Sequence, residues 1–145
     1  MGGATIEESS EHTDQVEAVE IVAGDDVLGP SSAFDVIKFD IEGAEPRAAL
    51  GLQSVLARSS EAAIILEVMP DRWQGQGDFG SILSRFQLSR IHTYEIAGDG
   101  LLDPLDLGDP LTLQKLAERP SGFYMLMLPR DHWAVDFARA NSRTA

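Results

Sequence analysis

The feature that most constrains the fold is a pair of short apolar segments separated by a helical pattern. Residues 35–39 (DVIKF) and 62–68 (AAIILEV) are rich in β-branched and aromatic side chains, and such near-continuous runs are typical of strands covered on both faces. Between them, the segment 44–58 has apolar residues at helical spacing, with Pro46 suited to a first helical turn. The sequence therefore predicts a parallel β-α-β unit with a right-handed crossover.

The following residues extend this pattern. Apolar spacing predicts a helix over 78–88 and a third strand over 91–96, and residues 122–128 (GFYMLML) predict a last strand. The stretch 97–110 is rich in Gly, Asp and Pro and predicts a loop. We expect an α/β fold with a partial Rossmann-like sheet, mostly parallel, in which the last strand lies antiparallel beside the other three.

The chain has 145 residues, which suits a single domain. Residues 1–15 are small, polar and acidic without a hydrophobic period, so we expect a flexible lead-in. The alternation of apolar and acidic residues over 15–22 predicts a half-buried strand. We expect the domain to cover 16–138, with a short amphipathic helix after Pro129, and 139–145 to form a polar tail.

The charge balance excludes several classes of partner. The formal net charge is -13 and no basic stripe offsets it, so the overall field repels nucleic acid and anionic membrane surfaces. No apolar run approaches the roughly 20 residues that span a bilayer, and residues 1–10 lack the basic and apolar pattern of a signal peptide. We therefore expect a cytoplasmic protein. The chain has no cysteine, which excludes disulfides and thiolate chemistry.

Carboxylates follow or close two of the predicted strands. Asp40 and Glu42 come directly after the first strand, and Glu67 stands at the end of the second. Because open α/β sheets bind ligands outside the carboxyl ends of their strands, we expect these three side chains to face one crevice. Gly43 allows the chain to turn sharply beside them.

Several roles are open to these acids. Asp40 or Glu42 could remove a proton from a substrate or bind its hydroxyl groups, and the cluster could instead hold Mg²⁺ together with water. A purely structural alternative is that the acids cap the next helix and accept hydrogen bonds from loop N–H groups. Glu45, beside Pro46, fits that structural role best, and Lys38 is expected to pair with an acid or extend to solvent.

The order and spacing of these residues resemble a known family. The FkbM-type S-adenosylmethionine-dependent methyltransferases have three such features in order. They are a strand end I-K-x-D-x-E-G-x-E, a helix with Leu-x-Gly, and a strand that ends in I-x-E. The resemblance covers about 16–128 and is strongest over 35–68. The residues that fall on the pattern are Lys38, Asp40, Glu42, Gly43, Glu45 and Glu67.

The resemblance implies a function and a set of site residues. It implies transfer of a methyl group from S-adenosylmethionine to a hydroxyl group of a sugar, glycolipid or polyketide-like acceptor. Asp40 and Glu42 are then the expected catalytic residues, while Glu67, Gly43 and Trp73 are expected to bind the acceptor. No metal is assigned by the resemblance.

One part of the family's pattern has no counterpart before Val16. A complete domain of this type opens with a strand, a glycine-rich turn for the cofactor, and a second strand ending in an acid. We expect the chain to begin about halfway through such a domain, which leaves the strand over 35–39 as an open edge. It is then a piece of a longer methyltransferase, a shortened relative that still binds a ligand, or a non-catalytic module that dimerises.

Two further patterns carry little functional weight. Residues 75–80 match G-x-G-x-x-G, but a dinucleotide-binding loop follows its strand directly, and residues 70–74 intervene here. We expect a flexible loop over the crevice instead. His12, His92 and His132 are dispersed and lack the spacing of a metal site.

Overall fold

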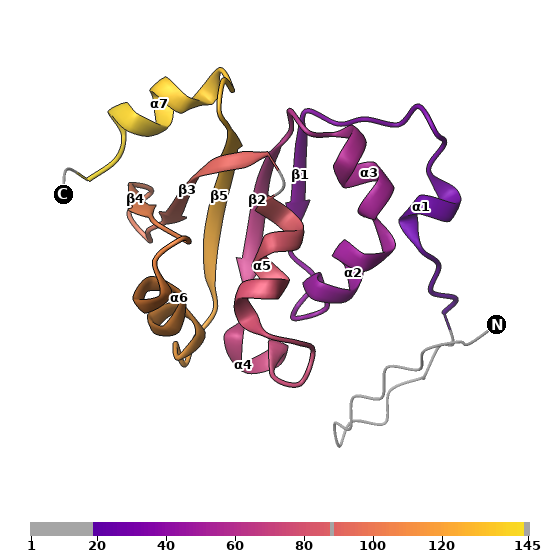
Figure 1. The fold of residues 1–145 in the computed structure, drawn as a ribbon, viewed down its shortest axis with the longest axis horizontal. Coiled ribbons are helices and arrows are strands. Elements are labelled where there is room, and N and C mark those ends of the chain that lie inside the picture. Colours follow the sequence, from indigo (N-terminus) through magenta and orange to yellow (C-terminus); the bar gives the residue numbers. More distant parts are fainter. Residues whose placement is uncertain (1–18, 88, 144–145) are drawn as a thin grey trace.

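The computed structural model describes residues 19–87 and 89–143, which form a mixed α/β fold around one open sheet. The strand order is β1-β2-β5-β3-β4 (Figure 1). The strands are β1 (Val36–Phe39), β2 (Ala63–Val68), β3 (Arg90–Ile96), β4 (Leu102–Leu105) and β5 (Phe123–Pro129). The predicted strands over 35–39, 62–68, 91–96 and 122–128 all form, each within about a residue or two of the expected ends.

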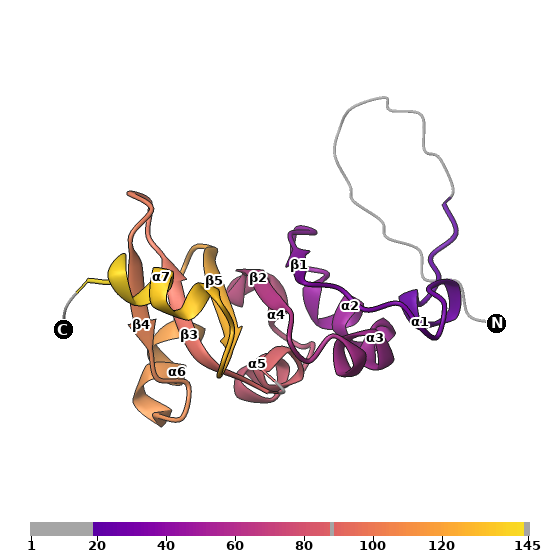
Figure 2. The same cartoon turned by 90° about the horizontal axis from the view of Figure 1, so that it is seen from above.

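Helices cover the sheet unequally (Figure 2). Most pack on one face, where the main core contains Phe39, Leu66 and Met125, and α7 packs on the opposite face, where a smaller cluster contains Leu128 and Val135. This division follows from the alternation of side chains along each strand. The helices are α1 (Gly24–Val27), α2 (Glu45–Gly51), α3 (Gln53–Arg58), α4 (Pro70–Trp73), α5 (Phe79–Gln87), α6 (Pro110–Ala117) and α7 (Ala134–Ala140).

The expectation of a mostly parallel sheet is wrong. Among the strand pairs of residues 19–87 and 89–143, only β1 and β2 are parallel, whereas β5 pairs antiparallel with both β2 and β3, and β4 pairs antiparallel with β3. The strands β1, β2 and β3 do run in the same direction, but β5 lies between β2 and β3 and converts what would be a parallel pair into two antiparallel ones. An apolar run shows that a strand is buried on both faces without showing which strands are its neighbours.

The predicted helix over 44–58 is divided at Leu52 into α2 and α3. Gly51 lies against Ala23, so that a Cβ on Gly51 would be 3.4 Å from the Cα of Ala23. Asp25 in α1 accepts hydrogen bonds from the backbone N–H groups of Ser54 and Val55, at 2.8 and 2.9 Å, and so caps α3. The break in the helix therefore comes from the packing of α1 against it.

The C-terminal residues also differ from expectation. Helix α7 runs to Ala140, and Arg143 forms ion pairs of 2.7 Å with both Asp99 and Asp103. Residues 139–143 are thus attached to the β3-β4 hairpin and do not form a tail. The predicted loop over 97–110 contains β4 and the first residue of α6.

Two expectations concern the N-terminal region. Residues 19–22 form no strand, and the rest of the predicted strand over 15–22 lies outside the described residues, as does the lead-in over 1–15. Across residues 19–87 and 89–143, no helix combines the length and the apolar character needed to cross a membrane.

Candidate functional site

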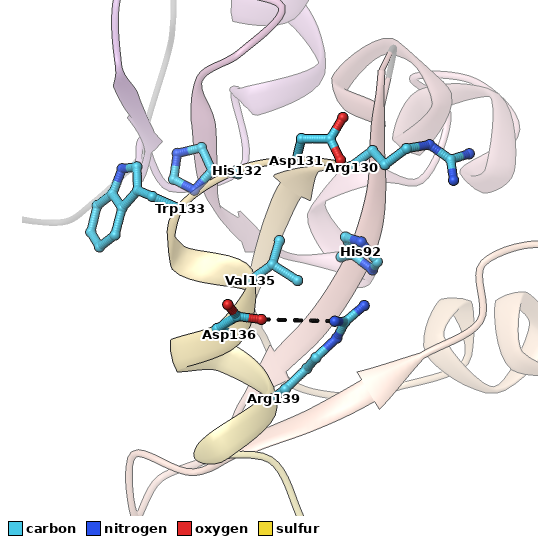
Figure 3. Close-up of a pocket in the computed structure, with 8 residues that line it drawn as sticks. All are labelled: His92, Arg130, Asp131, His132, Trp133, Val135, Asp136 and Arg139. Carbon is cyan, nitrogen blue, oxygen red and sulfur yellow. Dashed lines mark ion pairs between the residues drawn. The ribbon is translucent and has the colours of Figure 1, made fainter.

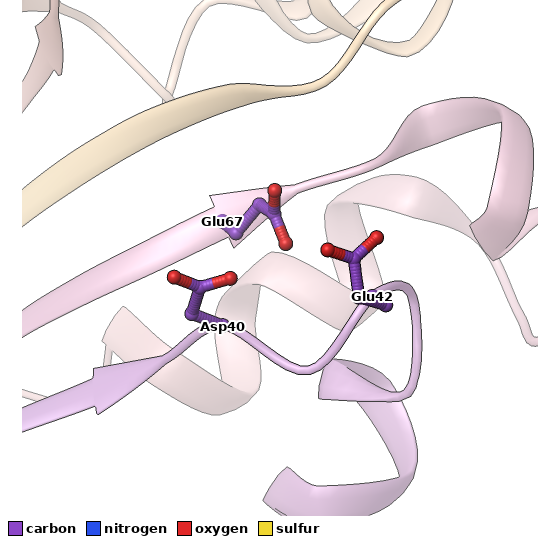
Figure 4. A group of neighbouring side chains, drawn as sticks. All are labelled: Asp40, Glu42 and Glu67. Atoms are coloured by element: carbon purple, nitrogen blue, oxygen red, sulfur yellow. The ribbon is translucent and has the colours of Figure 1, made fainter.

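The carboxylates of Asp40, Glu42 and Glu67 come together at the carboxyl ends of β1 and β2 (Figure 4). The parallel register pairs Phe39 with Leu66, so the residues that follow each of them, Asp40 and Glu67, come from adjacent strands at the same edge of the sheet. Each of the three residues offers one carboxylate oxygen, and these oxygens lie within 4.8 Å of one another. The structure therefore brings together the three acids that the sequence analysis expected to meet at these strand ends.

Asp40 is the most strongly paired of the three acids. Nζ of Lys38 lies 2.6 Å from Oδ2 of Asp40, and the hydroxyl of Tyr124 donates a hydrogen bond of 3.3 Å to the same oxygen. The hydrogen bond from Lys38 is the main cause that lowers the pKa of Asp40. Asp40 is therefore anionic at neutral pH, and Lys38 pairs with an acid as expected.

Glu67 has the opposite environment. Its side chain is almost buried, with the residue 8% exposed, and Oε2 has no hydrogen-bond partner among the described residues. Burial first, and then the negative charges of Asp40 and Glu42, raise the pKa of Glu67. Two neighbouring carboxyl groups with pKa values displaced in opposite directions are a common arrangement for acid-base chemistry.

Glu42 lies in a loop whose backbone has an uncommon, left-handed conformation. Its φ is 58°, and that of Gly43 is 99°, so two successive residues adopt a left-handed conformation. Such a conformation is uncommon for a residue with a side chain and persists where the surroundings stabilise it. Nη1 of Arg72 donates hydrogen bonds to the backbone oxygen and to Oε2 of Glu42, at 2.8 and 3.3 Å, and Nε2 of Gln76 donates to the backbone oxygen of Gly43.

Glu45 and Trp73 lie behind the cluster, in the core. Oε1 of Glu45 accepts hydrogen bonds from the backbone N–H groups of Ile41 and Gly43, and Oε2 accepts one of 3.0 Å from Nε1 of Trp73. Glu45 is fully buried, which agrees with the structural role predicted for it. Trp73 is buried as well, and that it binds the acceptor stays a prediction. Its indole satisfies a buried carboxylate.

Sequence reasoning missed Tyr124 and Arg72. Tyr124 comes from β5 and pairs with Glu67 in the β2-β5 register, although 57 positions separate them in the chain. The only signal was a residue with a polar end inside an otherwise apolar strand. Arg72 lies among residues 70–74, between the second predicted strand and the glycine-rich segment, and its pairing with Glu42 depends on the tertiary fold.

The glycine-rich segment 75–80 adjoins this site but shows a structural role. Gly75 and Gly77 have positive φ values of 79° and 141°, and Oδ2 of Asp78 accepts a hydrogen bond from the backbone N–H of Ser81 near the start of α5. Gln76 is the residue of the segment that contacts the loop after β1. The segment is thus a connection that supports the Glu42 loop.

The histidines lie elsewhere. His92 and His132 line a surface cavity of about 510 Å³ with Arg130, Trp133 and Arg139 (Figure 3), and His12 lies outside the described residues. Within the described part of the chain, the one group of side chains spaced to hold a metal ion is Asp40, Glu42 and Glu67. The acidic cluster is therefore the best candidate for a functional site.

Comparison with protein-family models, with curated proteins and with solved structures gives no match for this chain.

Proposed function

We propose that this chain is an S-adenosylmethionine-dependent methyltransferase of the FkbM type, with Asp40, Glu42 and Glu67 at the site where the methyl donor meets its acceptor. The observation that carries the proposal is the convergence of Asp40, Glu42 and Glu67 at one edge of the sheet. These are the acids at the strand ends of the pattern that resembles the family. Their meeting is what a shared acceptor site requires, although the same fold can support other functions.

The chemistry of the proposed reaction suits this cluster. An acceptor hydroxyl oxygen attacks the methyl carbon of the sulfonium, the new C–O bond forms as the C–S bond breaks, and S-adenosylhomocysteine leaves. The hydroxyl proton passes to a carboxylate, and we assign this role to Glu67, which the resemblance places in acceptor binding, rather than to Asp40 or Glu42, because the pKa of Glu67 is raised. Asp40, which stays anionic, orients the hydroxyl. Alignment of the reactants contributes most of the rate enhancement in such a transfer.

The charge of the cluster also favours a sulfonium donor. S-adenosylmethionine has a positively charged sulfur that becomes a neutral thioether after transfer. The carboxylates of Asp40, Glu42 and Glu67 lie close enough together to attract that charge jointly. The same charge disfavours a strongly anionic acceptor, so the proposal is limited to neutral hydroxylated molecules such as a sugar, a glycolipid or a polyketide-like compound.

The sheet supports the proposal at the level of topology. We infer that it is part of a Rossmann-like methyltransferase sheet, because β1, β2 and β3 run in one direction and β5 is inserted antiparallel among them. An antiparallel last strand beside the others is what the family resemblance implies. The ligand-binding edge of such a sheet lies at the carboxyl ends of its strands, where the three acids are found.

The experiment that tests the proposal is calorimetric titration of the folded 145-residue chain with S-adenosylmethionine and with S-adenosylhomocysteine. We expect saturable binding that weakens at least about tenfold in Asp40→Asn. Asp35→Asn is the matched control, because Asp35 is exposed and precedes the opposite end of β1. Absence of heat with either ligand, or equal binding by both variants, would refute the proposal.

A second candidate function is assembly through the open edge of the sheet. β1 is an edge strand, Val36 is 53% exposed, and an apolar cavity of about 260 Å³ lined by Leu28, Phe34 and Val36 lies beside it. Exposed apolar edges are normally covered or paired. If the chain is a non-catalytic module that dimerises here, sedimentation should show a concentration-dependent dimer that Val36→Lys abolishes and Val27→Lys, at an exposed position in α1, does not.

A further inference from the structure

We propose that Asp40, Glu42 and Glu67 bind a hard divalent cation of the size of Ca²⁺ or Mg²⁺. Two independent observations carry this inference, namely the spacing of the carboxylate oxygens and a buried oxygen of Glu67 that lacks a partner. Hard divalent cations take carboxylate oxygens as their preferred ligands and complete their coordination with water.

The spacing fits a single ion. Two oxygens bound to one Ca²⁺ ion can be separated by at most twice the metal-oxygen distance, or about 4.6 to 5.2 Å, and for Mg²⁺ by about 4.0 to 4.2 Å. The carboxylate oxygens of Asp40, Glu42 and Glu67 lie within 4.8 Å of one another. The cluster can therefore accept an ion of the size of Ca²⁺ with little movement, and Mg²⁺ after a slight contraction.

The second observation is the state of Glu67. The residue is 8% exposed, and Oε2 is buried without a hydrogen-bond partner among the described residues. Its carboxylate is directed towards Asp40 and Glu42 (Figure 4). A buried acceptor left without a partner is unfavourable, and more so when it is charged, and a bound cation would pair with this oxygen.

The neighbouring basic side chains do not supply that partner. Lys38 pairs with Asp40 at 2.6 Å and Arg72 pairs with Glu42 at 3.3 Å. Among the described residues, no lysine, arginine or histidine forms an ion pair with Glu67. The side of the cluster towards solvent is open, since the side chain of Glu42 is 70% exposed. Water can therefore reach the positions that the protein leaves free.

Cation binding does not depend on methyl transfer. The cation site and the methyltransferase proposal meet at one point: an acceptor oxygen could occupy a free coordination position of the ion. That role of the ion rests on the proposed function. A test of cation binding alone therefore separates them.

The experiment is calorimetric titration of the full chain, stripped of metal, with CaCl2, MgCl2 and MnCl2 in turn. We expect saturable binding of at least one ion near one-to-one stoichiometry. Glu67→Gln, which keeps the shape of the side chain and removes its charge, should weaken binding at least tenfold. Glu61→Gln is the matched control, because Glu61 is exposed and lies before the opposite end of β2.

A second variant covers the case in which the buried substitution impairs folding. Asp40→Asn changes an exposed member of the cluster, and it should weaken binding to a similar degree. A rise in the melting temperature on addition of the ion, present in the wild type and in Glu61→Gln and lost in both cluster variants, would support the site because only the folded protein then binds the ion.

The outcomes separate the two proposals. Absence of saturable binding of all three ions, or binding that both cluster variants retain, would overturn the cation site. If the cation site fails while S-adenosylmethionine still binds, the proposed function stands without a metal. If an ion binds through the cluster and S-adenosylmethionine does not bind, the cation site stands and the methyltransferase assignment does not.

Discussion

Nε1 of Trp73 donates a hydrogen bond of 3.0 Å to Oε2 of Glu45, and both side chains are buried. The other oxygen of Glu45 accepts hydrogen bonds from the backbone N–H groups of Ile41 and Gly43 in the loop after β1. This loop contains Glu42. The core of the protein therefore fixes the position of the site, and Trp73 supports the loop that contains Glu42.

The first prediction concerns this buried pair. Trp73→Phe leaves Oε2 of Glu45 without its donor, so we expect the free energy of unfolding to fall by about 1 to 3 kcal/mol from that loss alone. In a double-mutant cycle with Glu45→Gln, urea denaturation should give a coupling energy of about 0.5 to 3 kcal/mol. Trp133→Phe is the control, because Trp133 is 80% exposed. Additive effects of the two substitutions would contradict the role of the pair.

The second prediction separates two reasons for glycine in the loops near the site. Gly43→Ala combines a φ of 99° with a Cβ that would lie 2.7 Å from the Cβ of Arg72, whereas Gly75→Ala has a φ of 79° and no atom within 4 Å. Both should lose about 1 to 2 kcal/mol from the left-handed backbone. We expect Gly43→Ala to be clearly less stable in urea than Gly75→Ala, and equal losses would show that the contact with Arg72 is unimportant.

The third prediction is that Glu67→Gln stabilises the protein at neutral pH when no divalent cation is present. The pKa of Glu67 is raised in the folded state, so the folded protein binds this proton more tightly than the unfolded chain does. The contribution of Glu67 to stability is complete below its ordinary pKa, about 4.3, and is lost as the pH rises through the folded-state pKa. The glutamine side chain does not ionise, so the variant does not lose stability in this way as the pH rises.

Urea denaturation at several pH values tests that prediction. The advantage of Glu67→Gln over the wild type should grow as the pH rises, while Glu61→Gln should track the wild type. If Glu67→Gln were less stable than the wild type by the same amount at every pH, the prediction would be contradicted, because ionisation of Glu67 would then not destabilise the folded protein.

The fourth prediction concerns the cap that joins α1 to α3. Hydrogen bonds from the backbone N–H groups of Ser54 and Val55 lower the pKa of Asp25, so its contribution is complete above the ordinary aspartate pKa of about 3.9. It is lost as the pH falls through the lower folded-state value. The difference in stability between the wild type and Asp25→Ala should therefore shrink in strong acid. Asp26→Ala, at the exposed neighbouring position, should have little effect at any pH.

The sequence was most informative where burial alone decides the structure. The strands β1 and β2 and the meeting of Asp40 with Glu67 followed from apolar runs and from the parallel register that a β-α-β unit imposes. The neighbours of β5 could not be predicted in the same way, because a strand buried on both faces shows the same pattern wherever it lies in the sheet. For the same reason Tyr124, which reaches Asp40 across that register, was missed.

The buried contact of Trp73 could not be predicted, for a different reason. Trp73 follows a strand end and precedes a glycine-rich segment, where an aromatic residue can either line a pocket or pack in the core. The choice depends on whether its N–H finds a buried acceptor, and that acceptor is Glu45, 28 positions earlier in the chain. Local pattern also gave no sign that α1 would divide the following helix at Leu52.

The central claim is that the acids at the carboxyl ends of β1 and β2 form a ligand site. The most direct test is a titration of the ¹⁵N-labelled chain with S-adenosylmethionine, followed by amide chemical shifts. The account predicts saturable shifts at Asp40, Gly43 and Glu67, which need at least about tenfold more ligand in Asp40→Asn and are unchanged in Asp35→Asn. Shifts confined to the cavity of His92 and Arg139, or no saturable shifts in a folded sample, would contradict it.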